Sequence, residues 1–245
     1  MDLATGRIRW TYQALADDAW NLGCSIPGGS ICPKENGVDY DFGAAAILVK
    51  TKAGKELVLA GQKSGWVYAI DPAHGKLVWK TKVGRGGMLA GIYFGMATNR
   101  DAVFVPVADV PDGKQHAEPA RPGLYALDLD GGKFLWKAPI DPSVCKDRGP
   151  QCEPGIGAPV TVSNDLVLSG AYDGRLRFFN AGTGQQVWEY DTMQDTKTVG
   201  GGIASGGSIG GSAGPVVYGN AVIVESGYDF AGRIPGNLLL VFEAP

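Results

Sequence analysis

The 245-residue sequence is poor in charged residues, in histidine and in long apolar runs. Its 22 Lys and Arg residues are scattered and are balanced by 25 Asp and Glu, which excludes the basic surface of a nucleic-acid-binding protein. No segment approaches the roughly 18 consecutive apolar residues of a membrane-spanning helix. Residues 1–6 contain neither a basic region nor an apolar run, so we expect no signal peptide in this chain.

Glycine, by contrast, is abundant, with 38 residues in the chain. It shows no three-residue period, which excludes a collagen-like protein, and 44% of the residues are hydrophobic, enough to bury a core. Frequent glycine among short apolar segments is typical of strands joined by tight turns. The composition therefore predicts an all-β fold.

The cysteines lie in two local pairs within loops rich in Gly and Pro. The separations, eight and seven residues, do not match the usual spacing of zinc ligands, and the only two histidines are distant in sequence. We expect two disulfides, which would indicate an oxidising compartment, with free thiols as the alternative. The expected pairs are Cys24 with Cys32 and Cys145 with Cys152.

One pattern recurs four times along the chain: a turn that ends in glycine, three further residues, and a tryptophan. The tryptophans follow one another at intervals of 69, 57 and 52 residues, which suits four-stranded β-propeller blades with insertions. We therefore expect these side chains to pack between neighbouring blades. They are Trp10, Trp79, Trp136 and Trp188.

The pattern predicts three complete blades and two incomplete ends. Residues 3–12 would supply only the final strand of one blade, and the last blade, 213–245, would lack its fourth strand. We expect residues 1–245 to form one partial propeller domain of about four blades, a piece of a longer protein. The expected strands are 44–50, 56–61, 65–70 and 76–82; 91–97, 102–107, 123–128 and 133–138; 156–162, 165–170, 174–179 and 185–190; and 214–218, 220–225 and 237–242.

A glycine-rich stretch, residues 200–214, invites comparison with a phosphate-binding loop. No Gly-Lys-Ser/Thr follows it, and a strand rather than a helix is expected next, so no helix N-terminus is available for a phosphate. We expect a close-packed crossing of the backbone instead.

The repeat resembles the Asp-x-x-x-Gly-x-x-x-Trp docking motif of pyrroloquinoline quinone repeat proteins over essentially the whole chain. The resemblance implies a β-propeller that has eight blades when complete. That group includes periplasmic quinoprotein alcohol dehydrogenases and non-catalytic outer-membrane assembly lipoproteins. The motif therefore implies a fold without deciding between an enzyme and a scaffold that binds partner proteins.

Two segments resemble the alcohol dehydrogenases more specifically. Residues 10–21, WTYQALADDAWN, are similar to the Tyr-Gln-x-x-x-x-Asp-x-Trp-Asp stretch of their active sites. Residues 60–71, AGQKSGWVYAID, are similar to the next blade, where the family places a Lys or Arg against the quinone oxygens. The segments DDAWNLGC and PGNLLLVF most resemble the branch that oxidises polyvinyl alcohol, of which this chain would be the C-terminal half.

The resemblance implies a role for each of four residues. Oxidation of an alcohol by a quinone needs a base for the hydroxyl proton and a cation near the quinone oxygen. We expect Asp18 to be the base, Lys63 the cation, and Trp20 and Asn21 to lie beside the cofactor. Asn21 occupies the position of the family's usual base, and an amide cannot accept the proton.

Each of these residues also has a structural interpretation. Asp18 could cap a loop, Lys63 could be a solvated lysine of a hairpin, and Trp20 could pack beneath an insertion.

The resemblance implies further components. They are pyrroloquinoline quinone and Ca²⁺, an alcohol substrate and a cytochrome c as electron acceptor. We expect the calcium ligands to lie in the missing N-terminal part, and we expect a periplasmic location.

Overall fold

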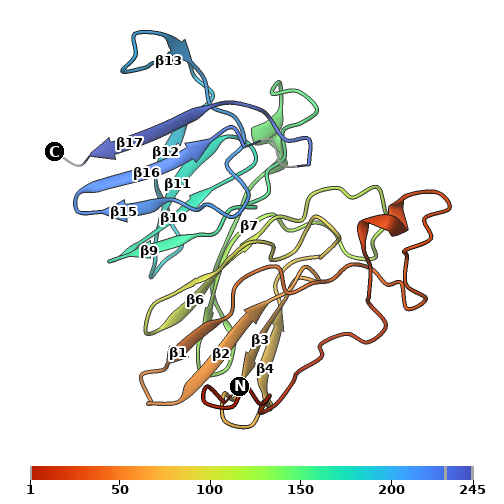
Figure 1. Ribbon diagram of the computed structural model, residues 1–245. Helices are drawn as coiled ribbons and strands as arrows, with labels where there is room; N and C mark the ends of the chain where they lie inside the picture. The colour runs from red at the N-terminus through yellow and green to blue at the C-terminus, as the bar shows by residue number, and fades with distance from the viewer. Residues whose placement is uncertain (1, 229–230, 244–245) are drawn as a thin grey trace.

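The computed structural model describes residues 2–228 and 231–243 and consists mainly of antiparallel strands in successive sheets (Figure 1). The first sheet contains β1 (Ile47–Lys50), β2 (Glu56–Gly61), β3 (Trp66–Ile70) and β4 (Leu77–Lys82). The second contains β5 (Ala97–Thr98), β6 (Ala102–Val107), β7 (Gly123–Asp128) and β8 (Phe134–Pro139). The third contains β9 (Thr161–Ser163), β10 (Leu166–Gly170), β11 (Arg175–Asn180) and β12 (Gln186–Asp191).

A three-stranded sheet follows, with β15 (Val216–Tyr218), β16 (Ala221–Ser226) and β17 (Leu238–Glu243). The hairpin β13 (Thr196–Lys197) and β14 (Ile203–Ala204) projects away from the sheets, at the top of Figure 1. Two short 3-10 helices, η1 (Leu22–Ser25) and η2 (Pro142–Cys145), lie in loops. In the part of the chain that the structure describes, no helix has the length and apolar character needed to cross a membrane.

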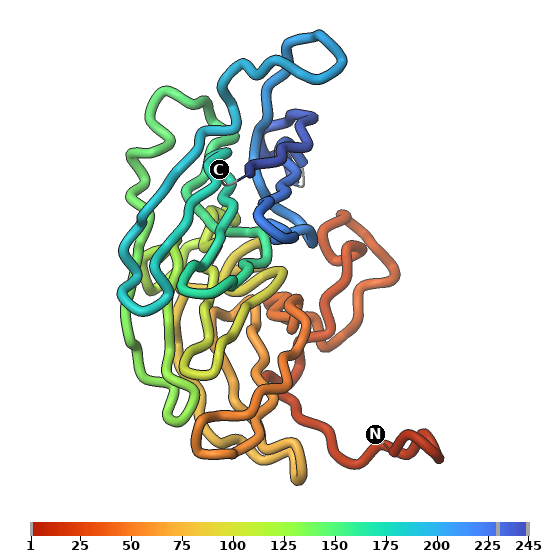
Figure 2. The backbone as a smooth tube through the Cα atoms, turned by 90° about the vertical axis from the view of Figure 1, so that its left-hand side faces the viewer, coloured from red at the N-terminus to blue at the C-terminus, as the bar shows by residue number. Residues whose placement is uncertain are grey.

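The sheets follow one another in chain order, as expected for propeller blades, and form an open arc rather than a closed ring (Figures 1 and 2). The first strands β1, β5, β9 and β15 contact one another in that order. The all-β fold of four-stranded antiparallel blades is confirmed. The assignment of residues 1–245 to one partial domain stays a prediction.

Strand β6 shows how neighbouring sheets share a core. All six of its residues are buried, and successive side chains of a strand point to opposite faces. Val103, Val105 and Val107 pack with residues of the first sheet, whereas Ala102 and Phe104 pack with residues of the third. A blade between two others therefore buries both of its faces.

The repeated tryptophans join each sheet to the next. The Trp79 indole N–H donates to the Leu129 carbonyl at 2.9 Å, and the Trp136 indole N–H donates to the Ala181 carbonyl at 2.8 Å. Each indole also lies on the glycine of the next repeat, so closely that a Cβ on Gly132 or Gly184 would collide with the ring. The predicted packing role is confirmed for both. Trp188 also packs between two sheets, since its ring contacts Phe178 of its own sheet and Phe242 of β17 in the next one, which confirms the prediction for it as well.

The N-terminal segment contradicts one expectation, because residues 3–12 form no strand. No neighbouring strand among the described residues offers them a ladder of backbone hydrogen bonds. Trp10 docks all the same: its indole N–H donates to the Pro72 carbonyl at 2.8 Å, and its ring lies on Gly75. Residues 3–9 are exposed, and beyond Trp10 the segment contacts the first sheet where Tyr12 meets Tyr68 edge-on.

All four first strands are shorter than expected: 44–50 reduces to β1 and 214–218 to β15, and the largest losses are in 91–97, which reduces to β5, and 156–162, which reduces to β9. In the latter two, the missing residues bond between sheets instead of within one. Ile92 N–H donates to the Gln62 carbonyl, and Ile156 N–H donates to the Val107 carbonyl. The apolar composition of these segments is thus satisfied by inter-sheet packing rather than by a longer strand.

The glycine-rich stretch divides into two parts. Residues 206–211 are buried and cross other backbone closely; a Cβ on Gly207 would lie 2.2 Å from the Ile234 carbonyl oxygen. The expected close-packed crossing is confirmed there. Residues 200–202 instead lie in the turn of the exposed hairpin β13–β14, which the sequence did not predict.

The last sheet has the three strands that the sequence predicts, although residues 229–230 and 244–245 of the expected blade lie outside the described residues. Only one of its faces is packed. Along β17, Leu238 is buried, whereas Leu239 is 66% exposed and Val241 is 56% exposed. An outer face of this composition resembles the faces that neighbouring blades cover elsewhere in the chain.

The docking geometry predicts different effects for two glycines of one hairpin. Gly184 has a φ of +72°, and a Cβ there would lie 2.5 Å from Trp136 Cε3, so Gly184→Ala should destabilise the protein by roughly 2–4 kcal/mol. Gly182 has only the Asn180 Oδ1 at 3.5 Å, and Gly182→Ala should change the stability by less than about 0.5 kcal/mol. Urea unfolding measures both, and equal midpoints for the two variants would contradict the docking role.

Candidate functional site

The loop that follows Asp18 is held by a disulfide and by Asn21. The Cys24–Cys32 disulfide closes it, as predicted, and the Cys145–Cys152 disulfide closes the second predicted loop. The Asn21 side chain caps η1: its Oδ1 accepts from Gly23 N–H at 2.8 Å, and its Nδ2 donates to the Ile31 carbonyl at 2.9 Å. Asn21 therefore shapes this loop with both ends of its amide.

Asp18 connects the two ends of the long loop formed by residues 18–40. Its two carboxylate oxygens accept the backbone N–H groups of Asp39 and Tyr40, each at 2.7 Å. Gly37 packs against the same carboxylate, since a Cβ there would lie 2.3 Å from Oδ1. Asp18 thus caps the turn that presents residues 39–41, which is the structural alternative considered for it.

Lys63 lies in the tight turn between β2 and β3, where it binds two carboxylates. Its Nζ donates to Asp39 Oδ2 at 2.9 Å and to Asp41 Oδ2 at 2.8 Å, and it lies 5.3 Å from the centre of the Tyr93 ring. The side chains of Lys63 and Asp39 are only 9% and 7% exposed, whereas that of Asp41 is 61% exposed. The solvated-hairpin interpretation of Lys63 is therefore wrong.

Burial and the shared Lys63 shift the pKa values of Asp39 and Asp41 in opposite directions. Burial raises the pKa of Asp39 despite its hydrogen bond with Lys63. Burial acts in the same sense on Asp41, but the hydrogen bond and charge of Lys63 outweigh it and lower the pKa of Asp41. For Lys63, burial works against the charged form, and the hydrogen bonds to Asp41 and Asp39 nevertheless raise its pKa.

Lys63, Asp39 and Asp41 form a charged cluster, and a cavity of about 240 Å³ opens beside it. Asp18 and Asp41 both line it, whereas Lys63 does not and reaches it only through its hydrogen bond to Asp41. Trp20 and Asn21 are not among its lining residues. Those residues are Tyr12, Gln13, Ala14, Leu15, Asp18, Tyr40, Asp41, Phe42 and Gln62.

Arg233 is a second cation near Tyr93, the ring that Lys63 also approaches. Arg233 is 8% exposed and stacks on Tyr172, with its guanidinium carbon 5.0 Å from the ring centre. Burial raises the pKa of Tyr93, while the charges of Lys63 and Arg233 both lower it. Among the described residues, Arg233 makes no ion pair and donates no hydrogen bond to a protein group. Its charge also acts on Glu153: burial raises the pKa of that carboxyl, and Arg233 acts to lower it.

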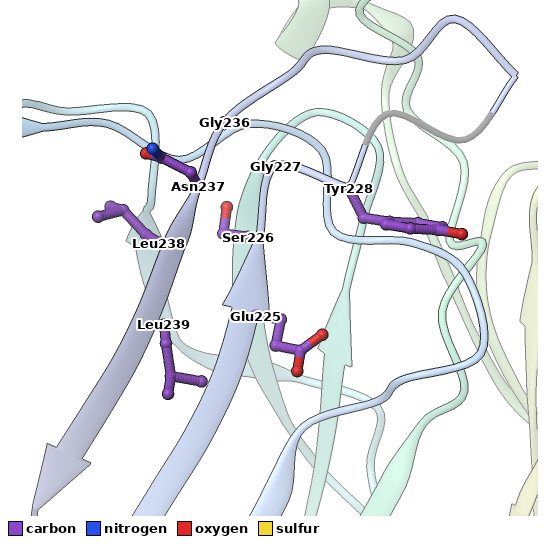
Figure 3. Close-up of a pocket in the computed structure, with 8 residues that line it drawn as sticks. All are labelled: Glu225, Ser226, Gly227, Tyr228, Gly236, Asn237, Leu238 and Leu239. Carbon is purple, nitrogen blue, oxygen red and sulfur yellow. The ribbon is translucent and has the colours of Figure 1, made fainter.

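A different hollow, of about 330 Å³, lies where β16 and β17 diverge (Figure 3). Glu225, Ser226 and Tyr228 line one side of it, and Asn237 and Leu239 line the other. None of its lining residues is a cation, so it offers no counterpart to the Lys63 cluster. Within residues 2–228 and 231–243, no group of three or more His, Cys, Asp or Glu side chains could hold a metal ion.

The sequence identified Asp18 and Lys63 but missed the residues that connect them. Asp39 joins the two, since its backbone N–H bonds Asp18 and its carboxylate bonds Lys63. The signal available was the Asp39-Tyr40-Asp41 triplet, which is followed by the small residues 43–46 that lead into β1. Nothing in the local sequence marked Tyr93 or Arg233.

The model of a pyrroloquinoline quinone repeat family, described as "Outer membrane protein assembly factor BamB", matches residues 63–237, more than half of the chain. The matched segment contains three of the four tryptophan repeats. The chain belongs to this family.

Two curated relatives of this family member are named polyvinylalcohol dehydrogenase, from Pseudomonas sp. and from Sphingopyxis sp. (strain 113P3). Each is 36% identical over 99% of this chain, which spans 38% and 39% of their respective lengths. A solved quinohemoprotein alcohol dehydrogenase of Pseudomonas putida HK5 superposes with a TM-score of 0.57, covering 85% of this chain and 40% of that one. That pair is 15% identical, so the superposition shows a shared fold alone.

The cluster predicts unequal effects for two lysines that each pair with an aspartate. Lys63→Met leaves the buried Asp39 carboxylate without its cation and should cost about 3 kcal/mol. Lys52→Met removes an exposed pair with Asp101 and should cost less than about 1 kcal/mol. Thermal or urea unfolding of the two variants measures the difference.

The Lys63→Met deficit should also depend on pH. Without the lysine, burial keeps the Asp39 pKa above its unfolded value, so the folded state binds the extra proton and gains stability as the pH falls. The loss of unfolding free energy relative to wild type should therefore be smaller in acid and largest at neutral pH. A deficit that does not vary with pH would contradict the ion-pair assignment.

Proposed function

We propose that this chain is part of a quinoprotein dehydrogenase that oxidises alcohols, polymeric secondary alcohols among them, with pyrroloquinoline quinone as oxidant. The observation that carries the proposal is Lys63, a buried cation held by two aspartates beside a cavity, in a relative of proteins named polyvinylalcohol dehydrogenase. The chain spans about two fifths of those relatives, so we propose that the isolated chain is inactive.

The N–H donors of Lys63 and Arg233 suit pyrroloquinoline quinone. An ammonium group has three N–H donors, and Asp39 and Asp41 use two of those on Lys63. The third can donate to a quinone oxygen, where it stabilises the negative charge that develops there. Arg233 stacks on Tyr172 and makes no ion pair with a described residue, although its charge acts on Glu153, and a guanidinium so placed suits a carboxylate of the same cofactor.

Asp18 would act as the base on the substrate side of this site, and Trp20 and Asn21 would lie beside the cofactor. Asp18 and the Cys24–Cys32 loop fix the turn that carries Asp39 and Asp41, and Trp20 stands between them in sequence. A bound quinone supplies the electron acceptor for the hydride of the alcohol carbon. The described residues do not provide a calcium site.

The remaining parts of the proposal concern the setting. Two disulfides favour an oxidising compartment, and we place the protein in the periplasm with a cytochrome c as its electron acceptor. The second candidate function is a propeller scaffold that binds partner proteins, since the matching family model is described as an outer-membrane assembly factor.

Cofactor uptake separates the two functions. The full-length protein, titrated with pyrroloquinoline quinone and followed by absorbance, should bind it stoichiometrically and then reduce a dye when a secondary alcohol or polyvinyl alcohol is added. A scaffold should take up no quinone. No uptake by the folded protein would exclude the proposed function.

Two arginines refine this test. Arg233→Gln should weaken quinone binding by about 10-fold or more, the loss expected for one charge-assisted hydrogen bond. Arg100→Gln alters an exposed arginine outside the cluster and should leave the affinity unchanged. Equal affinities for both variants would remove Arg233 from the cofactor site.

A further inference from the structure

A hollow of about 390 Å³ lies where the first and second sheets meet, near their edge strands β4 and β8. Pockets of this size hold small ligands in many proteins. Its lining includes Lys82 of β4, Arg121 just before β7, Tyr125 of β7, and Phe134 and Lys137 of β8. It shares no lining residue with the cavity of the candidate functional site.

Three of the seven lining residues are cations, and none is acidic. The Lys82 Nζ donates to the Ser64 carbonyl at 2.7 Å and to the Arg85 carbonyl at 3.0 Å, which leaves one of its three N–H groups without a described acceptor. The Lys137 Nζ lies 4.3 Å from the centre of the Phe134 ring. Neither lysine makes an ion pair with a described residue.

Two carboxylates act on Lys82 from outside the lining, and both are engaged elsewhere. Glu118 binds Arg121 at 2.7 Å, and its side chain is 45% exposed. Asp109 accepts four backbone N–H groups. Burial lowers the pKa of Lys82, the charge of Arg121 acts in the same sense, and the charges of Glu118 and Asp109 do not cancel this effect. The protein therefore compensates the ammonium of Lys82 only in part.

The third sheet shows how the same repeat position is balanced elsewhere in the chain. Lys137 and Glu189 are equivalent, because each directly follows the tryptophan of its repeat. On the third sheet, three arginines are matched by three carboxylates. The ion pairs are Arg148–Asp191, Arg175–Glu189, Arg177–Glu189 and Arg177–Asp173. Where the first and second sheets meet, a lysine replaces the glutamate and no lining residue supplies the opposite charge.

We propose that this hollow binds a small oxyanion with two or more negative charges, such as a dicarboxylate or a phosphate, between Lys82, Arg121 and Lys137. The anion accepts the remaining N–H of Lys82 from the first sheet and an N–H of Lys137 from the second, and so holds the two sheets together. Two negative charges match the two lysines that lack an ionic partner, and hydrogen bonds between charged groups are about twice as strong as neutral ones. This site is separate from the proposed cofactor site, and it exists whether or not the protein is a dehydrogenase.

The test titrates the full-length protein with succinate and with inorganic phosphate by calorimetry, at an ionic strength held constant with sodium chloride. At least one of the two should bind stoichiometrically and raise the unfolding temperature by about 3 °C or more at saturation. The tighter of the two identifies whether a carboxylate or a phosphate is preferred. If neither binds, the proposal is wrong.

Substitutions at Lys137 locate the bound anion. Lys137→Glu gives the second sheet the carboxylate that Glu189 supplies in the third, so it should weaken anion binding by at least about 10-fold and raise the unfolding temperature of the anion-free protein. Lys137→Gln removes the charge without replacing it and should weaken binding without a comparable rise. Lys133→Glu makes the same charge change at an exposed lysine outside the hollow and should bind the anion like wild type.

Arg233→Gln separates this site from the proposed cofactor site, whose arginine would also attract an anion. This variant should bind succinate or phosphate with the affinity of wild type. Wild-type affinity in both Lys137 variants, or a loss of binding only in Arg233→Gln, would overturn the proposal. Failure of the protein to take up quinone would overturn the dehydrogenase function and leave the anion site standing.

Discussion

The contact between an indole and a glycine of the next hairpin determines how the sheets of this protein stand to one another. Each docking tryptophan donates one hydrogen bond to a carbonyl beyond its own sheet and lies on a glycine with no side chain in the way. Because the same contact recurs between successive units, the sheets turn by similar steps and their first strands meet. The loops between blades are thereby brought to the region where Lys63, Tyr93 and Arg233 act on one another.

The candidate site depends on a second contact, between Asp18 and the turn at residues 39–40. The excursion from residue 18 to residue 39 contains little regular structure, and the structure returns it to the first sheet through one carboxylate and one disulfide. Asp39 has a φ of +68°, which aspartate tolerates better than most residues. Asp18 and Asp41 therefore have complementary tasks, since the first fixes the backbone that presents the second to Lys63.

The sequence predicted the blades well because their signals are local. Alternating apolar residues, a turn glycine and a tryptophan at fixed spacing identified the middle and outer strands of three sheets. The first strands were overestimated because Ile92 and Ile156, although apolar, bond to carbonyls of neighbouring sheets. Residues 3–12 carry the docking signal without a strand, which shows that the tryptophan contact does not require a β-ladder around it.

The sequence predicted only part of the candidate site, because its other residues are distant along the chain. Lys63 and Asp18 stood in segments that resemble a known family, but the residues that decide their roles come from turns distant along the chain. Asp39 converts Lys63 from a hairpin lysine into a buried ion-pair partner. Arg233 stacks on Tyr172, and about sixty residues separate the two in the sequence. No local sequence pattern predicts this contact.

The two-sided burial of β6 has a consequence for how such a chain can change its length. Its odd-numbered valines serve one core and its even-numbered residues serve another, so a single inserted residue would exchange the two sets. Insertions are tolerated only where no such alternation must be kept. The unequal intervals between the tryptophans agree with this, because the long connection between β6 and β7, residues 108–122, accommodates extra chain without altering either core.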